Sequence, residues 1–338
     1  MITQERTIFL TGGAGYIGSC LAAHLGNLGY HPIILDNFST SLRNNETNFP
    51  VKEVDLTDPL ALKIVWNELP SPGAVIHLAA KALVGESVTH PENYFRNNIN
   101  AALNVAELAS QTKGCVFVHS SSCAIYGIPE TLPIQESSPK NPISPYGMSK
   151  WMVEQMLDQF REWRKLPLAH LRYFNPSGAM THKGIWYGES HVPETHLIPL
   201  VIQNAQTTGK IPVFGTDYPT PDGTCIRDFI HIEDLCEAHR LALEHLRQNP
   251  SQNESFNLGF GKGISVKEVV TTTSQVLGKP LQIEPLKRRL GDPPVLFADN
   301  RMAKQILGWS PKHSLESMIQ SHLSWIEKSL NLSDGRKK

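Results

Sequence analysis

The chain predicts an α/β protein: a doubly wound parallel sheet of the Rossmann type with a smaller, interleaved C-terminal substrate domain. Short apolar runs alternate with helical patterns, which is typical of a buried parallel sheet. A glycine-rich turn joins the first apolar run to the first helical pattern. Beyond Phe174, glycine and proline become frequent and the strand-like runs become shorter. We therefore expect a first domain over residues 1–175, a second over 176–330 and a flexible tail over 331–338.

The first element is a β-favouring run over residues 7–11, and a turn with glycines at 12, 15 and 18 follows it at once. The spacing is Gly-x-x-Gly-x-x-Gly, whereas most dehydrogenases have Gly-x-Gly-x-x-Gly. Leucines then repeat at helical spacing until Gly29, which we expect just past the end of a helix. A strand, a glycine turn and a helix in this order predict dinucleotide binding, because the helix N-terminus offers free N–H groups to a pyrophosphate.

The second strand covers residues 32–35 and ends at Asp36, about twenty residues past the glycines. A carboxylate at this place can accept both hydroxyls of an adenosine ribose and would repel a 2′-phosphate. No arginine follows directly, and Arg43 is the nearest one. These observations favour NAD over NADP.

Four further strands are expected over residues 51–55, 74–78, 115–119 and 168–173. Ser120, Ser121 and Ser122 follow the fifth strand, and ligands collect at the carboxyl ends of such strands. A helix is expected from Ser149 onward. Its apolar stripe consists of Met152, Val153, Met156, Leu157, Phe160 and Trp163.

Tyr146 and Lys150 lie four residues apart at the start of this helix, so their side chains share one face. A free tyrosine has a pKa of about 10, and a nearby ammonium lowers that pKa. The pair therefore suits a proton acceptor for a sugar or alcohol hydroxyl near neutral pH. The spacing alone also arises by chance, and it is the glycine turn together with Asp36 that makes an enzyme the leading interpretation.

Bulk properties exclude several other classes. The net charge of −1 gives no reason to expect nucleic acid or an anionic membrane as a partner. No apolar run approaches 18 residues, and the polar start is unlike a signal peptide. The five cysteines lack Cys-x-x-Cys spacing, which indicates reduced thiols in a cytoplasmic protein. The histidines are scattered, so we expect no metal site.

Together the motifs resemble the extended short-chain dehydrogenase/reductase superfamily and, within it, the UDP-galactose 4-epimerases, from Thr7 to about Trp325. The segments that carry the resemblance are residues 11–18, 35–37, 84–87, 120–122, 144–150, 172–176, 222–224, 227–231 and 288–292. The glycine turn and the serine run mark the superfamily, and the later segments indicate nucleotide-sugar epimerases.

The resemblance implies tightly held NAD and a 4-epimerisation that interconverts UDP-galactose and UDP-glucose. Tyr146 would remove the proton of the sugar 4-hydroxyl while the C4 hydride moves to NAD and later returns to the opposite face of the keto sugar. Lys150 would bind the nicotinamide ribose and lower the pKa of Tyr146, and Ser122 would bond the 4-oxygen. Members of this family commonly form homodimers, so the resemblance also implies a homodimer.

The resemblance also implies two sets of contacts. The cofactor contacts are Gly12, Gly15, Tyr16, Ile17, Gly18, Asp36, Asn37, Asp55, Leu56, Leu78, Ala79, Ala80, Asn97, Tyr146, Lys150 and Phe174. The UDP-sugar contacts are Ser122, Tyr146, Asn175, His196, Leu197, Phe214, Arg227, Arg289, Asp292 and Leu296. Within the second set, Asn175, Arg227 and Arg289 would bind the diphosphate, since guanidinium groups bind phosphate oxygens bidentately. Phe214 would pack on uracil and Asp292 would bind the ribose.

Three positions depart from the family pattern. Ala82 stands where a lysine is usual, with Lys81 one residue early. His196 and Leu197 replace an Asn-Leu pair. Leu296 stands where enzymes restricted to plain hexoses have a tyrosine, so we expect room for an acetamido group as the sugar turns.

Several alternatives remain open or are disfavoured. A 4,6-dehydratase needs an Asp-Glu pair after Ser122, and a UDP-glucuronate decarboxylase a glutamate, whereas this chain has Cys123 and Ala124. A 4-epimerase of another UDP-sugar, such as UDP-GlcNAc, UDP-glucuronate or a UDP-pentose, stays open. A non-catalytic NAD-binding sensor or scaffold typically lacks the Tyr or the Lys, and both are present here.

Overall fold

The computed structural model describes residues 3–41, 48–191, 193–252, 254–289 and 292–335. Arg43 therefore lies outside the described residues. Helix α10 (Leu315–Gly335) runs into the segment expected to be a flexible tail, of which residues 336–338 lie outside the described part.

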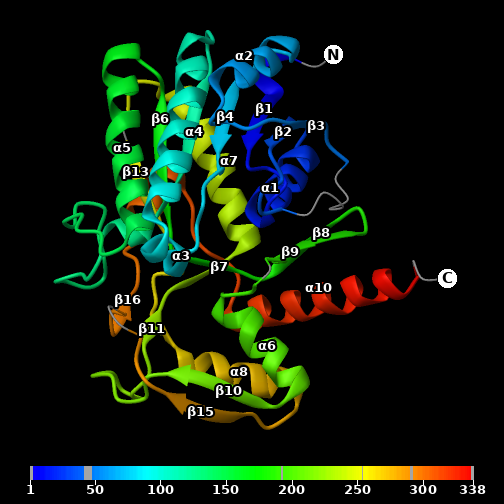
Figure 1. Cartoon of the computed structure of the whole chain (residues 1–338), viewed down its shortest axis with the longest axis vertical. Coiled ribbons are helices and arrows are strands. Elements are labelled where there is room, and N and C mark those ends of the chain that lie inside the picture. Colours follow the sequence, from blue (N-terminus) through cyan, green and yellow to red (C-terminus); the bar gives the residue numbers. More distant parts are fainter. Residues whose placement is uncertain (1–2, 42–47, 192, 253, 290–291, 336–338) are drawn as a thin grey trace.

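A seven-stranded sheet forms the centre of the larger part of the molecule, and its strand order is β13-β6-β5-β4-β1-β2-β3 (Figure 1). All of its neighbouring strands pair in parallel. The strands are β1 (Thr7–Thr11), β2 (His31–Asp36), β3 (Val51–Glu53), β4 (Ala74–His77), β5 (Val116–Ser122), β6 (Leu168–Tyr173) and β13 (Glu254–Leu258). Strand order reverses between β1 and β4, as in a doubly wound fold, so the predicted fold class is confirmed.

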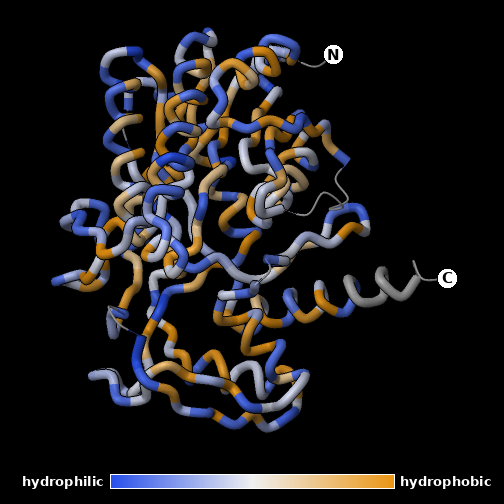
Figure 2. Tube along the Cα trace, viewed as in Figure 1, coloured by the Kyte–Doolittle hydropathy of each residue, from blue (hydrophilic) through white to orange (hydrophobic). Residues whose placement is uncertain are grey.

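Helices cover both faces of this sheet because side chains of a strand alternate between its faces. Ile8 and Leu10 of β1 lie in one hydrophobic cluster, and Phe9 between them lies in another. The first cluster packs against α1 (Tyr16–Asn27), α7 (Ile232–Gln248) and α9 (Arg301–Leu307). The second packs against α2 (Pro59–Glu68), α4 (Pro91–Gln111) and α5 (Pro145–Arg164). Figure 2 shows that hydrophobic residues are frequent along these strands and recur along the helices that cover them.

The smaller part has its own hydrophobic cluster, built on α6 (Leu197–Thr207), α8 (Val266–Leu277) and α10. Its strands are β10 (Lys210–Phe214) paired with β15 (Gln282–Leu286), and β11 (Ile226–Arg227) between β14 (Ile264–Ser265) and β16 (Val295–Leu296). The remaining elements are η1 (Gln4–Arg6), α3 (Val84–Thr89), η2 (Cys123–Ile125), β7 (Asn175–Ser177), β8 (Ala179–His182), β9 (Ile185–Gly188) and β12 (Phe229–His231). Because β13 and α7 return to the large sheet, the two parts are interleaved in sequence, as predicted. The boundary at residue 175 stays a prediction.

Some expected bounds need correction. Strand β3 ends at Glu53, two residues early, and β5 continues through Ser122, so the serine run belongs to the strand. Helix α5 begins at Pro145 because Ser144 caps it by accepting a hydrogen bond from the Gly147 N–H. The apolar stripe predicted for this helix was partly wrong, since Met152 is 42% exposed and Trp163 is 76% exposed.

Gly29 follows α1 with a φ of 79°, as predicted for a residue just past a helix. None of the helices in the described ranges is long and apolar enough to span a membrane.

Candidate active site

The glycine turn forms an open cradle at the start of α1. Gly12 has a φ of 69°, and a Cβ on it would lie 2.7 Å from the backbone nitrogen of Ala79. A Cβ on Gly18 would lie 2.5 Å from the Gly12 carbonyl oxygen. Gly15 is the N-cap of α1 and supplies no side-chain cap, so this residue leaves the first N–H groups of the helix available. The turn therefore fits a pyrophosphate, as predicted for NAD.

Asp36 ends β2 beside this turn and is buried. Its carboxylate accepts hydrogen bonds from the N–H groups of Ala14, at 3.0 Å, and Phe38, at 2.8 Å. It is thereby held next to the cradle, where it can meet an adenosine ribose. Asp55 is exposed and bonds Thr57, and the buried Leu56 follows it. Both come directly after β3, the strand beside β2.

Asn98 organises the segment after β4, and the sequence analysis missed it. This buried side chain accepts a hydrogen bond from the Lys81 N–H at 2.8 Å and donates to the Lys81 carbonyl at 3.1 Å. It also donates to the Ser149 hydroxyl at 2.9 Å, one residue before Lys150. The available signal was an asparagine on the buried face of α4. The predicted cofactor contacts Leu78, Ala79, Ala80 and Asn97 lie on this segment or on the same helix.

The three predicted catalytic side chains come together at the carboxyl end of β5. Tyr146, in the first turn of α5, is hydrogen-bonded to Ser122. Lys150 is 4% exposed and donates to the Ser120 carbonyl at 2.7 Å. Helix α5 approaches the serine strand closely, since a Cβ on Gly147 would lie 2.5 Å from the Ala124 carbonyl oxygen.

Burial has the largest effect on the pKa values of Tyr146 and Lys150. It raises the pKa of Tyr146 to about 12, against an opposing hydrogen bond from Ser122. It lowers the pKa of Lys150 to about 8, against the attraction of Glu154. The expectation that Lys150 lowers the pKa of Tyr146 is therefore not met by the chain alone: desolvation of the phenolate dominates, and the Lys150 ammonium is directed to Ser120.

The predicted diphosphate contacts lie on short paired strands of the smaller part. Asn175, in β7, donates from its side-chain amide to the Asp228 carbonyl at 2.5 Å. Arg227, in β11, forms an ion pair with Asp292 at 2.5 Å. A predicted phosphate contact and a predicted ribose contact are thus in direct contact with each other.

The predicted uracil and sugar contacts are close to this site. The Arg289 guanidinium lies 4.1 Å from the centre of the half-exposed Phe214 ring, so these two predicted contacts come together. Leu296 pairs in register with Arg227 and packs against a buried cluster that includes Phe174. Part of the role of Leu296 is therefore to fill space in the hydrophobic core beside the site.

His196 is the N-cap of α6, and Leu197 is the first residue of that helix. The His196 Nδ1 is 2.8 Å from the Glu194 carboxylate. This interaction raises the pKa of His196, although burial acts in the opposite direction. A protonated imidazole here would add a third cation to the two arginines.

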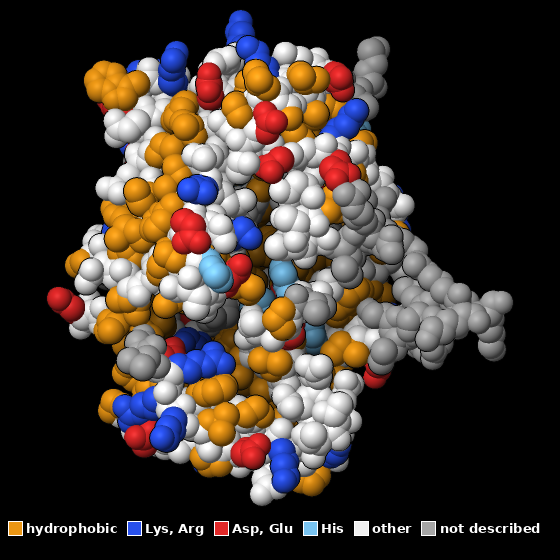
Figure 3. Space-filling model, viewed as in Figure 1, with side chains coloured by type: hydrophobic (Ala, Val, Ile, Leu, Met, Phe, Trp, Pro, Cys, Tyr) orange, Lys and Arg blue, Asp and Glu red, His pale blue; other side chains and the backbone are white. Residues whose placement is uncertain are grey.

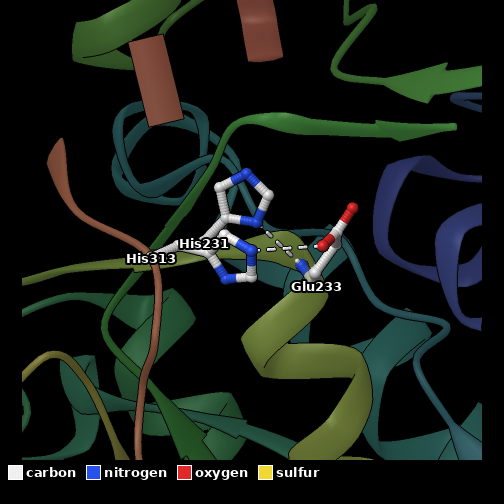
Figure 4. Close-up of side chains that lie close together, drawn as sticks. All are labelled: His231, Glu233 and His313. Atoms are coloured by element: carbon white, nitrogen blue, oxygen red, sulfur yellow. Dashed lines mark hydrogen bonds and ion pairs between the residues drawn. The ribbon is translucent and has the colours of Figure 1, made fainter. Parts of the chain in front are cut away.

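Two groups of side chains in the described residues have metal-ligand chemistry, although the sequence predicted no metal site. They are His231, Glu233 and His313, and Glu189, Glu194 and His196. Figure 4 shows the first group, in which the His231 ring accepts from the Glu233 N–H at 3.1 Å and His313 contacts the Glu233 carboxylate at 3.2 Å. The other ring nitrogen of His231 contacts Ser321 at 3.0 Å. Both ring nitrogens of His231 thus have a partner within the protein. This histidine therefore links β12 to α7, through Glu233, and to α10, through Ser321.

The fold and this site define an enzyme of the Rossmann class that holds a dinucleotide at one end of its sheet and a second ligand beside Tyr146. Comparison with known proteins makes this specific: residues 8–259 match the model of the NAD dependent epimerase/dehydratase family, and the chain belongs to that family. The chain is 41% identical over 325 residues to a UDP-glucose 4-epimerase from Rhizobium leguminosarum bv. trifolii, covering 96% of this chain and 98% of the relative.

Solved structures agree with this assignment. A UDP-glucose 4-epimerase from Brucella ovis in complex with NAD has a TM-score of 0.87 and 41% identity, over 93% of this chain and 96% of that one. A UDP-Glc/GlcNAc 4-epimerase from Campylobacter jejuni has a TM-score of 0.80 and 36% identity, over 95% of this chain and 99% of that one.

Proposed function

We propose that this protein interconverts UDP-galactose and UDP-glucose by oxidising C4 of the sugar and reducing it again, with NAD as a resident cofactor. The observation that carries the proposal is the meeting of Ser122, Tyr146 and Lys150 at the end of β5, on the same sheet edge as the glycine cradle and Asp36. The relatives named as UDP-glucose 4-epimerases support it.

The chain's own residues would hold and move one proton. Tyr146, as the phenolate, takes the proton of the 4-hydroxyl, and Ser122 hydrogen-bonds the 4-oxygen throughout. NAD, when bound, would accept the C4 hydride and return it to the opposite face, so the reaction has no net redox change. Because burial raises the pKa of Tyr146 to about 12, positive charge beside the phenol is required to make it a base near neutral pH. Lys150, one helical turn after Tyr146, is a candidate for part of that charge.

The nucleotide would be held by the smaller part. Arg227, Arg289 and Asn175 would bind the diphosphate, His196 would assist them, and Phe214 would pack on uracil. Binding would exchange the Arg227–Asp292 ion pair for a bond between guanidinium and phosphate and would release Asp292 toward the ribose.

The substrate range follows from what surrounds Ser122. The next residues, Cys123 and Ala124, form the short helix η2 and offer no carboxylate, which disfavours dehydration or decarboxylation. Leu296 replaces a ring with a smaller side chain at the sugar pocket, and the Campylobacter relative is named for both plain and N-acetylated sugars. We therefore propose turnover of both UDP-galactose and UDP-N-acetylgalactosamine.

The test is incubation of the purified protein, without added NAD, with UDP-galactose, UDP-N-acetylgalactosamine and UDP-sugars that lack C6, followed by separation of the products. UDP-glucose should form from UDP-galactose. Conversion of only the C6-lacking sugars would replace this proposal with a 4-epimerase of pentoses. Tight NAD binding without any conversion would favour the sensor or scaffold.

We also propose a cytoplasmic homodimer. Met148, Met152 and Trp163 are exposed on one face of α5, and Leu103 is exposed on α4, which packs beside it. Figure 3 shows hydrophobic side chains gathered along the side of the molecule where α5 lies. Such a face suits a helix-to-helix interface between two copies. All five cysteines are unpaired, as expected in a reducing compartment.

Light scattering tests the dimer. Wild-type protein should have the mass of two chains, and Met152→Glu should reduce it to one. Leu60→Glu, at an exposed leucine on α2, is the matched control and should leave the mass unchanged. A monomeric wild type would contradict the proposal.

A further inference from the structure

Asp228 joins β11 to β12, and its side chain is fully buried, with 0% exposed. Its carboxylate accepts three backbone hydrogen bonds: from Phe260 at 2.7 Å, from Gly261 at 3.1 Å and from Ala298 at 3.0 Å. A carboxylate with several such bonds holds the segments that donate them at fixed positions. None of these contacts involves a residue of the proposed catalytic group.

The backbone of Asp228 makes a second set of contacts. Its carbonyl oxygen accepts from the Asn175 N–H at 3.1 Å and from the Asn175 side-chain amide at 2.5 Å. The orientation of the Asn175 amide is therefore set by the position of this carbonyl. Arg227 is the residue directly before it in the chain.

The segments that meet at Asp228 come from different parts of the molecule. Phe260 and Gly261 follow β13, the outer strand of the large sheet, and Ala298 follows β16, which carries Leu296. Through its side chain and its backbone carbonyl, this one residue thus joins the end of the large sheet to the strands that carry three proposed UDP-sugar contacts: Asn175, Arg227 and Leu296.

The neighbouring residues pack closely against this carboxylate. A Cβ on Gly259 would lie 2.4 Å from Oδ2 of Asp228 and 3.0 Å from the Cβ of Ala298. The segment after β16 has a second anchor, since Ile134 accepts from the Asp299 N–H at 2.8 Å and donates to the Phe297 carbonyl at 2.9 Å. Loss of the Asp228 bonds should therefore shift this segment rather than unfold it.

We propose that Asp228 is a positioning residue for the UDP-sugar: it fixes Asn175, Arg227 and the strand of Leu296 relative to one another and to the large sheet. This inference rests on the proposed function, because it concerns the same ligand site. Ser122, Tyr146 and Lys150 belong to β5 and α5, which Asp228 does not bond. Its loss should therefore weaken nucleotide binding much more than it slows the chemical step.

The test is Asp228→Asn, which keeps the shape but replaces one acceptor oxygen by an NH₂ group, so at least one of the three N–H donors loses its partner. We expect the Kd of UDP, measured by calorimetry, and the KM of UDP-galactose to rise at least about tenfold, equivalent to about 1.4 kcal/mol. The kcat should stay within about threefold, in keeping with a role in binding.

Asp234→Asn is the matched control. Asp234 is also a buried aspartate whose carboxylate accepts two backbone hydrogen bonds, from Lys312 and His313, both at 3.0 Å. It has no described contact with the proposed UDP-sugar residues. This control should lower the melting temperature and leave the Kd of UDP unchanged, so it separates general destabilisation from positioning.

Gly259→Ala disturbs the same carboxylate, because the added Cβ would lie 2.4 Å from Oδ2 of Asp228. It should show the same increase in the Kd of UDP and provides the test if Asp228→Asn does not fold. A lower melting temperature with a UDP Kd within twofold of wild type, in either folded variant, would overturn the inference. Wild-type protein that binds no UDP would refute the proposed function and this inference together. Tight wild-type binding that the variants preserve would refute the inference alone.

Discussion

Lys150→Met tests whether the Lys150 charge makes Tyr146 a base. The structure gives the partly buried Tyr146 a pKa of about 12 before any ligand is bound. At pH 8, a phenol with that pKa is ionised to about one part in 10⁴, because each unit of pKa is a factor of ten and about 1.36 kcal/mol. The positive charges of the working site must therefore supply up to about 5 kcal/mol for the phenolate to predominate.

The variant removes the Lys150 share of this stabilisation. We expect kcat at pH 8 to fall by a factor between about 10² and 10⁴, and the acid limb of its pH profile to move upward, because the phenolate then forms only at higher pH. Wild type should also lose activity above a pH near 8, where a lysine with a pKa of about 8 gives up its proton.

The assay is kcat for UDP-galactose between pH 6 and 10 in wild type, Lys150→Met, Tyr146→Phe and the double variant. If lysine acts through the tyrosine, the double variant should lose no more activity than Tyr146→Phe alone. A Lys150→Met variant that keeps the acid limb of wild type, or two losses that multiply, would refute this role of Lys150.

The remaining predictions concern other parts of the chain. Tyr146→Phe should reduce kcat by about 10²–10⁴-fold and leave the Kd of UDP near that of wild type, and near-normal turnover would place the base elsewhere. Leu296→Tyr should lower kcat/KM for UDP-N-acetylgalactosamine relative to UDP-galactose, and an unchanged ratio would contradict the expected role of this position. Denatured protein should release NAD or NADH, and recovery of NADP would overturn the role of Asp36. Burial lowers the pKa of His77 to about 3 from 6.5. The contribution of His77 to stability should therefore be constant above pH 6.5 and decrease as the pH falls from 6.5 toward 3, by about 2 kcal/mol at pH 5. Urea unfolding at pH 7 and pH 5 should show a smaller loss of stability in His77→Gln than in wild type.

Much of the large sheet could be predicted because its strands are local apolar runs. β6 was predicted with its observed bounds, and β1 with the turn that follows it. The outer strand β13 was not predicted, since Glu254, Ser255 and Asn257 interrupt its apolar residues. It is a strand because it pairs with β6, a partner some 80 residues earlier, and such pairing leaves no local pattern.

The candidate site likewise contains residues that the sequence predicted and residues that it did not. The sequence identified Tyr146, Lys150 and Ser122 from their spacing and from family motifs. Asn98 was not singled out, and Asp228 was noted only as part of the segment 227–231, because both residues satisfy backbone groups that meet only in the folded chain. The sign of the Tyr146 pKa shift was also missed, because a residue spacing contains no information on how deeply a phenol is buried.

The late position of β13 in the sequence has a consequence for biosynthesis. A ribosome that has just released β6 must add roughly 80 more residues before β13 emerges, which takes several seconds at about 5–20 residues per second. During that interval β6 presents an unpaired row of backbone N–H and C=O groups to the surrounding cell. A fragment that ends near residue 175 would keep this row open permanently and should aggregate. Until β13, the last strand of the large sheet, is made, this edge of the nascent chain is open to pairing with other chains.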